Sequence, residues 1–279
     1  MSAASNKPAA APLAHRGFTI VELMIALLIA VLLMGGLVTM VQAMRRAFNA
    51  QSGLSQLQDD QRMAMMFLTS TIQAAGYYTL PATSGNSAAL SLPVQGVFAS
   101  AGQAVYGTGK WNDSPLQNTI TVRYMTAGGD GITNCAGGVS LVAATFVNTL
   151  SIDNSGNLNC TVTTIIAGVA SAPQITPIIT GSTLNGTLVK GVVGMQIYYG
   201  VQTLMANPTS VDTYLDGYTA NTAPSYWMAA VSTGTVGNVI SVKVTLTFKN
   251  PLYGQPGQNT QNIAFTRIIN VMNKTGAST

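Results

Sequence analysis

The sequence predicts an α+β protein in which a long N-terminal α-helix is followed by a β-rich globular head. Residues 18–41 form an apolar run in which Glu22 is the only formal charge, and no proline occurs between Pro12 and Pro81. From Tyr77 the composition shifts to glycine, serine, threonine, asparagine and valine in short alternating runs, which is typical of β-structure. We therefore expect one long helix and a head of about 200 residues, enough for a single core.

The apolar run is long enough to cross a membrane, because its roughly 24 residues exceed the length of about 20 that a spanning helix needs. Lys7, His15 and Arg16 precede it without an acidic neighbour, so the positive-inside rule places the N-terminus in the cytoplasm. A cleaved secretory signal and a plain anchor are the two ordinary interpretations. A secretory signal has its small-residue cleavage site after the apolar region, whereas Gly17 lies before this one.

Glu22 fits neither interpretation, because a carboxylate inside a bilayer costs roughly 2.5 to 3.5 kcal/mol and calls for a functional partner. It is the only glutamate of the chain. If the chain were cut between Gly17 and Phe18, the new α-amino group would lie one helical turn from Glu22. At about 4 Å and an effective dielectric constant near 20, such a pair is worth on the order of 4 kcal/mol before desolvation. The amine of a neighbouring subunit is the alternative partner.

The string GFTIVELMIALLIAVLL, residues 17–33, resembles the class III signal of type IV pilins and type II secretion pseudopilins. In that family a membrane-embedded prepilin peptidase cuts after the glycine and N-methylates the new first residue. The resemblance implies that Gly17 precedes the cut, that Phe18 becomes the methylated N-terminus, and that Glu22 is the carboxylate that guides assembly.

The same resemblance implies the α+β, type IV pilin-like fold, in which a helix with a membrane half and an amphipathic half packs on a β-rich head. The expected domains are a leader peptide at 1–17, a pilin helix at 18–76 with its transmembrane part at 18–41, and a periplasmic or extracellular head at 77–279.

The second half of the helix is expected to be amphipathic. Its apolar face follows spacings of three and four residues: Leu54, Leu57, Gln61, Met65, Leu68 and Ile72. Gly76 is the expected C-terminal stop. Gly35, Gly36 and Gly53 each weaken the helix by about 1 kcal/mol relative to alanine. We interpret them as sites of close packing, with local melting of the Gly35–Gly36 pair as the alternative.

Alternating side chains predict the clearest strands of the head. Residues 240–248 alternate apolar with polar side chains, so one face should be apolar and the other wet. Residues 120–124 alternate in the same way, which places Thr121 and Arg123 on a wet face. Two weaker candidates are residues 191–201 and 263–271.

Cys135 and Cys160 are the only cysteines. Both follow the membrane helix and so lie in an oxidising compartment of a bacterial envelope, where we expect them to form a disulfide. A metal site is the alternative, but two cysteines without a nearby histidine do not complete a zinc shell.

Parts of the head also resemble one branch of the family, the PilW minor pilins. The resemblance is carried by the runs IQAAGY at 72–77 and GVVGMQIYYG at 191–200, with looser matches around Trp227 and at 241–246 and 265–270. It implies a minor pilin that sits with other minor pilins at or near the pilus tip, primes polymerisation of the major pilin and helps present a large tip adhesin.

The resemblance also implies where the chain is located, and which partners it meets, before and after assembly. Before assembly the chain would be a single-pass inner-membrane protein with a periplasmic head, and it would meet the prepilin peptidase and the inner-membrane assembly platform. Afterwards it would lie at the pilus tip on the cell surface. The alternatives are a type II secretion pseudopilin and an adhesive or DNA-uptake pilus subunit.

Nucleic acid is not an expected partner. The chain has 12 basic and 8 acidic residues, and removal of a leader that contains Lys7 and Arg16 would leave 10 basic residues. The resulting charge near +2 is too small to argue for nucleic-acid binding by itself. Four basic residues of the head that could form a binding surface are too few and too scattered along the sequence to argue for one: Lys190, Lys243, Lys249 and Arg267.

We expect neither an enzyme nor a cofactor. The sole histidine, His15, lies in the leader, so the mature chain has no Ser-His-Asp or Cys-His arrangement. Only a hydrolase built from carboxylates stays open by spacing, with four candidates: Asp130, Asp153, Asp212 and Asp216.

Two further loops are candidate ligand sites. Asp153, Ser155 and Asn157 alternate like half of a calcium loop, but the later bidentate glutamate is absent, which favours a simple turn. Asp212 and Asp216 could line a binding loop, although such residues between strands are usually turn chemistry.

Overall fold

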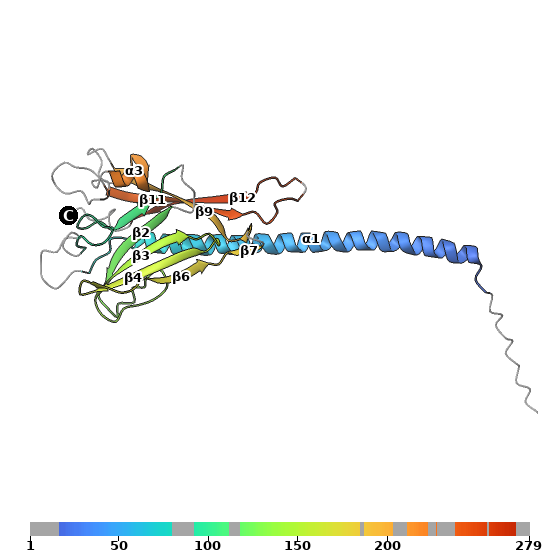
Figure 1. Ribbon diagram of the computed structural model, residues 1–279, viewed down its shortest axis with the longest axis horizontal. Helices are drawn as coiled ribbons and strands as arrows, with labels where there is room; N and C mark the ends of the chain where they lie inside the picture. Colours follow the sequence, from blue (N-terminus) through green and yellow to red (C-terminus); the bar gives the residue numbers. More distant parts are fainter. Residues whose placement is uncertain are drawn as a thin grey trace, which may run out of the picture. The chain divides into compact units, whose positions relative to one another are not determined.

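The computed structural model contains one long helix, followed along the chain by antiparallel β-sheets (Figure 1). It describes residues 17–79, 92–111, 118–184, 187–202, 211–222, 227, 238–255 and 257–271. The chain divides into two compact units, Met1–Ser52 and Gly53–Thr279. The first unit contains the beginning of helix α1 (Ile20–Gln73), and the second contains the rest of α1 together with the sheets.

In the first unit, α1 continues without a break through Gly35 and Gly36. A Cβ atom added to either glycine would meet no atom within 4 Å, and every described residue from 17 to 49 is exposed. The close packing that we expected at these two glycines is therefore not made by any residue that the structure describes. Lipid or the helices of other subunits could supply it.

In the second unit, α1 buries one face against the sheets. Four of the six predicted positions are buried, and they join the common core: Leu57, Met65, Leu68 and Ile72. Leu54 and Gln61 are half-buried. The predicted amphipathic face is confirmed, because its members follow the helical period and contact the same core.

The helix ends at Gln73, three residues before the predicted bound. Gly76 follows in a left-handed conformation, with a φ of 82°, which is favourable for glycine after a helix. Its amide donates to the carbonyl of Arg123 at 2.9 Å. The predicted stop at Gly76 is thus confirmed, and it ties the end of α1 to the first sheet.

The first sheet has six antiparallel strands. They are β1 (Val105–Thr108), β2 (Thr119–Thr126), β3 (Ala144–Ile152), β4 (Leu158–Ile166), β5 (Val169–Ala170) and β6 (Gln174–Ile179). They pair in chain order from β1 to β5, while β6 pairs with β4. A small hairpin of β7 (Ser182–Leu184) and β8 (Thr187–Lys190) follows.

The second sheet has the order β10-β9-β11-β12 and is antiparallel throughout. Its strands β9, β11 and β12 are labelled in Figure 1. Its elements are β9 (Val192–Gln202), β10 (Thr213–Asp216), β11 (Asn238–Lys249) and β12 (Asn262–Asn270), with the short helix α3 (Gly217–Thr222) after β10. On β11 the apolar residues of 240–248 are buried and the residues between them, except Ser241, are half-buried. The predicted strand is confirmed, and the two weaker candidates correspond to β9 and β12.

Tyr199 of β9 joins the two sheets in one core. Its hydroxyl donates to the carbonyl of Thr119 on β2 at 3.3 Å, and its ring lies edge-on to Trp227 at 4.9 Å. Burial raises the pKa of Tyr199. Gly107 of β1 is required here, because a Cβ atom at this position would overlap the Tyr199 hydroxyl.

Arg123 of β2 is the main departure from the predicted pattern, because its side chain is 1% exposed and not on a wet face. The guanidinium donates to carbonyl oxygens of the segment before β1: Leu92 at 3.1 Å, Pro93 at 2.5 Å, Ser100 at 3.3 Å and Gln103 at 2.6 Å. It also lies 4.3 Å from the centre of the Phe98 ring, a cation–π contact. The segment 92–103 therefore covers the face of β2 that alternation assigned to solvent, and Thr121 on that face is buried too.

The predicted disulfide between Cys135 and Cys160 is present, and both residues are buried. It fastens the connection between β2 and β3 to β4. We expect the double variant Cys135→Ser/Cys160→Ser to lose about 3 kcal/mol of unfolding free energy, because the bridge closes a loop with a sequence separation of 25. Urea unfolding of the oxidised and variant chains measures the loss. Two free thiols in the denatured, unreduced wild-type chain would contradict the bridge itself.

Gly53 is the one of the three helix glycines that packs closely. A Cβ atom there would lie 2.7 Å from Cβ of Pro251, and a proline ring cannot swing away. We expect Gly53→Ala to destabilise the head by about 1–2 kcal/mol, because the overlap outweighs the helix-propensity gain of about 1 kcal/mol. Gly36→Ala is the matched control, since it gains the propensity without an overlap. Equal unfolding midpoints for the two variants would contradict this packing.

Candidate functional site

The beginning of α1 is defined by a cap at Thr19. The Glu22 amide donates to the Thr19 hydroxyl at 3.2 Å, and the Leu23 amide donates to the Thr19 carbonyl at 3.1 Å. The helix therefore starts at Ile20, and residues 17–19 are not helical. Thr-x-x-Glu before an apolar run is the spacing of a capping box, so the sequence contained a signal for Thr19 that our sequence analysis missed.

The predicted cut site lies on this non-helical stretch. Phe18 is 82% exposed, and a Cβ atom added to Gly17 would meet no atom within 4 Å. An accessible peptide bond outside regular structure is what a protease needs, because the backbone must enter its active site without first unwinding a helix. The geometry at Gly17 and Phe18 suits cleavage between them.

Glu22 lies in the first turn of α1 and is exposed. The positive end of the helix dipole favours a carboxylate at this place. In the uncleaved chain Phe18 precedes the helix, so the expected geometry of one helical turn between Phe18 and Glu22 is not formed. Among the described residues no cation lies within ion-pair distance of Glu22, which leaves its carboxylate available to an amine that appears after cleavage or comes from another subunit.

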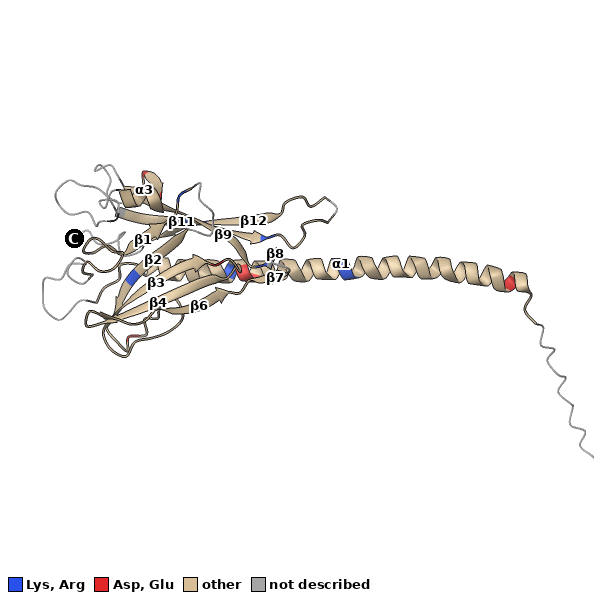
Figure 2. Ribbon diagram, in the orientation of Figure 1, with Lys and Arg blue, Asp and Glu red and all other residues tan. Residues whose placement is uncertain are grey.

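Helix α1 is long enough, and its first half is apolar enough, to cross a membrane. Its large side chains, from Ile20 to Phe48, are exposed almost without exception. Charges are sparse along it: Figure 2 shows a single acidic residue near its start, and the next charged residues are Arg45 and Arg46. Because no residue that the structure describes covers this apolar surface, it is suited to lipid before assembly and to the helices of other subunits afterwards.

The carboxylates that were candidates for catalysis or calcium binding accept hydrogen bonds from their own turns. Asp153 accepts bonds from the amides of Ser155 and Asn157 and from the side chains of Asn157 and Asn159. Burial alone would raise the pKa of Asp153, but these bonds lower it overall. The turn interpretation of this loop is confirmed, since both carboxylate oxygens are already used within the loop.

Asp130 and Asp216 behave in the same way. Asp130 accepts from the Thr126 hydroxyl at 2.5 Å and from the amides of Ala127 and Ile132, which lowers its pKa. Asp216 accepts from the amides of Thr219 and Trp111, and its pKa is lowered despite partial burial. Asp130 follows β2 and Asp153 follows β3, so they lie at opposite ends of the first sheet, and Asp216 belongs to the second sheet. Asp130 and Asp153 therefore do not form a catalytic pair.

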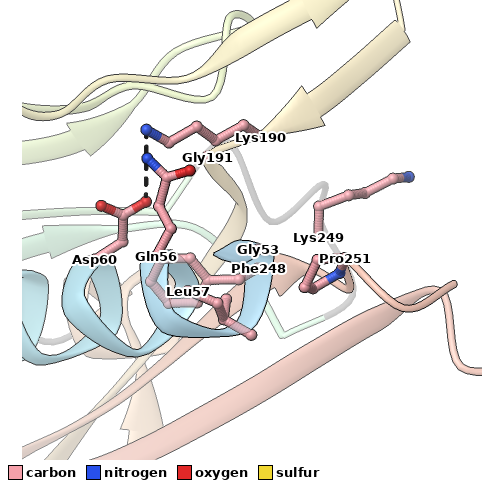
Figure 3. A pocket seen from close by; sticks show the side chains of 9 residues that line it. All are labelled: Gly53, Gln56, Leu57, Asp60, Lys190, Gly191, Phe248, Lys249 and Pro251. Carbon is pink, nitrogen blue, oxygen red and sulfur yellow. Dashed lines mark ion pairs between the residues drawn. The ribbon is translucent and has the colours of Figure 1, made fainter. Parts of the chain in front are cut away.

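A small hollow in the head lies between α1 and the second sheet (Figure 3). Lys190 Nζ lies 3.9 Å from the carboxylate of Asp60 on α1, while the Lys249 side chain extends away from that pair (Figure 3). Burial raises the pKa of Asp60, and Lys190 opposes this rise. An ion pair this long and exposed contributes about 0–1 kcal/mol. The hollow has the character of a helix–sheet junction.

Within the described part of the chain, no group of three or more histidine, cysteine or acidic side chains could hold a metal ion. Residues 1–16 of the predicted leader, which include His15 and Arg16, lie outside the described residues, and so do residues 80–91.

A family model for the prokaryotic N-terminal methylation motif matches residues 13–38. No curated protein and no solved structure matches the chain. The match covers the predicted cut site, Glu22 and the beginning of α1. It supports a type IV pilin or pseudopilin subunit, which implies processing by prepilin peptidase and assembly with other pilins, and such subunits are in general structural and not enzymatic.

Proposed function

We propose that this chain is a minor pilin of the PilW type, which joins other minor pilins at or near the pilus tip and primes polymerisation of the major pilin. The observation that carries the proposal is the start of α1. It has an accessible Gly17–Phe18 bond, a capped first turn, and a Glu22 without an ion pair among the described residues, ahead of an exposed apolar helix half. Each of these features suits a subunit that is cut, held in a membrane and then packed against other helices.

The size and build of the head favour a minor subunit. The head has about 200 residues, which is more than a major pilin usually carries. It contains two sheets, a disulfide and the buried Arg123. In this role the head would stay in the periplasm until assembly and then help to present a large tip adhesin at the cell surface. The inner-membrane assembly platform would drive its incorporation.

The test is an immunoblot for the major pilin in sheared surface fractions from a strain that lacks this chain. We expect surface pilin to be lost, and to be partly restored when the retraction motor is also removed, because a missing primer slows polymerisation relative to retraction. Wild-type chain should complement the loss, and Glu22→Leu should not. Unchanged surface pilin would contradict the proposal. A defect confined to protein secretion would instead assign the chain to a type II secretion system.

A further inference from the structure

The outer edge of the second sheet is an open template for another strand. β12 is the last strand of the order β10-β9-β11-β12. Its register with β11 runs from Ser241–Asn270 to Lys249–Asn262 without a shift, so the strand is straight over its whole length. It contains neither proline nor lysine, the usual devices by which natural proteins block edge pairing.

The other sheet edges are protected, which makes β12 an exception. β1 and β10 are four residues long, and β5 is two residues long. β6 carries Pro177 and pairs with β4 through a register shift. Short strands, proline and bulges all prevent unwanted pairing. Among the described strands, β12 is thus an edge of nine residues without the short length, proline or register shift that protects the others.

The backbone of β12 shows which groups point outward. The Val271 amide donates to the Ile240 carbonyl at 2.8 Å, and the Asn250 amide donates to the Gln261 carbonyl at 3.0 Å. These two bonds fix the alternation of the antiparallel ladder. The residues whose N–H and C=O groups face away from β11 are Asn262, Ala264, Thr266, Ile268 and Asn270. No described residue pairs with the outward backbone groups of 264–270, and Ile268 is 56% exposed.

The side chains of β12 define the chemistry of a partner strand. On one face Ile263 and Phe265 are only half-buried, and the exposed Arg267 has no ion pair among the described residues. Directly opposed residues of neighbouring strands interact, and opposite charges are favourable. An added strand would place apolar side chains against Ile263 and Phe265 and a carboxylate against Arg267. β12 has no acidic residue, so a second copy of β12 cannot supply this carboxylate.

We propose that β12 accepts an extended, acid-containing strand of a different protein subunit, which continues the second sheet in the assembled complex. The inference rests on the proposed role of the chain as an assembly subunit, and it names the surface and the chemistry of one partner. Backbone pairing supplies the affinity, and the Phe265 and Arg267 side chains select the partner.

The test is site-specific photo-crosslinking of the full chain in membranes of its own host. Benzoylphenylalanine replaces Thr266 or Ile268, and the control replaces Ile175, which is 68% exposed on the protected strand β6. We expect both β12 positions to crosslink to a different protein, in a segment that carries aspartate or glutamate, and the control not to. Absence of a β12 crosslink, or a product that is only a dimer of this chain, would overturn the proposal.

Backbone pairing is tested separately by Thr266→Pro, with Thr266→Val as the matched control. Proline removes an outward N–H without breaking a bond to β11, so the head should still fold, as urea unfolding can verify. With the photo-reactive residue at 268, the proline variant should reduce the crosslink at least tenfold and the valine variant should not. Equal crosslinking in both would overturn strand addition. The crosslinking measurements do not depend on surface pilin. They can therefore fail while the priming assay succeeds, or succeed while the priming assay fails.

Discussion

Arg123→Leu is expected to lower the unfolding free energy of the head by about 3–5 kcal/mol, since each buried carbonyl left without a donor costs about 1–3 kcal/mol. Four carbonyl groups between Leu92 and Gln103 accept hydrogen bonds from this one guanidinium. The carbonyls of Leu92 and Ser100 also accept from backbone amides, so the loss falls on those of Pro93 and Gln103. Removal of the side chain also removes the cation–π contact with Phe98. The leucine recovers part of the loss, because a buried cation is no longer desolvated.

Urea unfolding of the full chain in detergent, followed by the fluorescence of the buried Trp227, measures this loss. Arg123→Lys should recover less than half of it, because an ammonium group cannot span four acceptors in the way that a planar guanidinium does. Arg267→Leu is the matched control: the same substitution at an exposed arginine of β12 should change stability by no more than about 0.5 kcal/mol. If Arg123→Leu behaved like Arg267→Leu, the carbonyl network would not hold the segment 92–103 on the sheet.

Burial lowers the pKa of Arg123 to about 10. The folded state therefore holds this proton less tightly than the unfolded chain, whose arginine pKa lies above 12. At neutral pH the group is charged in both states, so the carbonyl network does not vary in strength between about pH 5 and 8.

The long elements could be predicted because their signals are local. Residues 240–248 alternate so regularly that β11 follows from the pattern, and the helical period of Leu57, Met65, Leu68 and Ile72 identifies the buried face of α1. The stop at Gly76 follows from the backbone freedom of glycine. In each case the residues that decide the structure are neighbours in the sequence.

Arg123 and Gly53 show what local patterns cannot predict. The alternation around Arg123 is the same whether water or the segment 92–103 covers that face, and only the tertiary structure brings the segment there. Gly53 meets Pro251, almost 200 residues away in the chain. Thr19 is different, because its capping-box spacing with Glu22 is visible in the sequence. Our sequence analysis did not use it to predict the helix start. The candidate site was otherwise predictable, since Gly17, Phe18 and Glu22 form one short string.

Gly17→Val is expected to leave the leader attached to almost all of the chain, a loss of processing of at least tenfold. The fold does not require this glycine, because a Cβ atom there would meet nothing within 4 Å and the residue precedes the first turn of α1. A β-branched side chain stiffens χ1 and crowds the adjoining peptide bond, which a protease must hold closely. Intact-mass analysis of the membrane-extracted chain distinguishes the uncut precursor from the cut, methylated form that begins at Phe18.

Gly36→Val is the matched control, because Gly36 is also a glycine with open space around it, and this variant should be cut and methylated normally. Efficient cleavage of Gly17→Val would contradict the assignment of the cut site. If Gly17→Val stays uncut while its head unfolds at the same urea concentration as the wild type, the fold does not need this glycine. The glycine is then needed for recognition by the peptidase. That outcome also separates Gly17 from Glu22: a chain with Glu22→Leu should be processed yet fail to assemble, because its carboxylate meets an amine only after the cut.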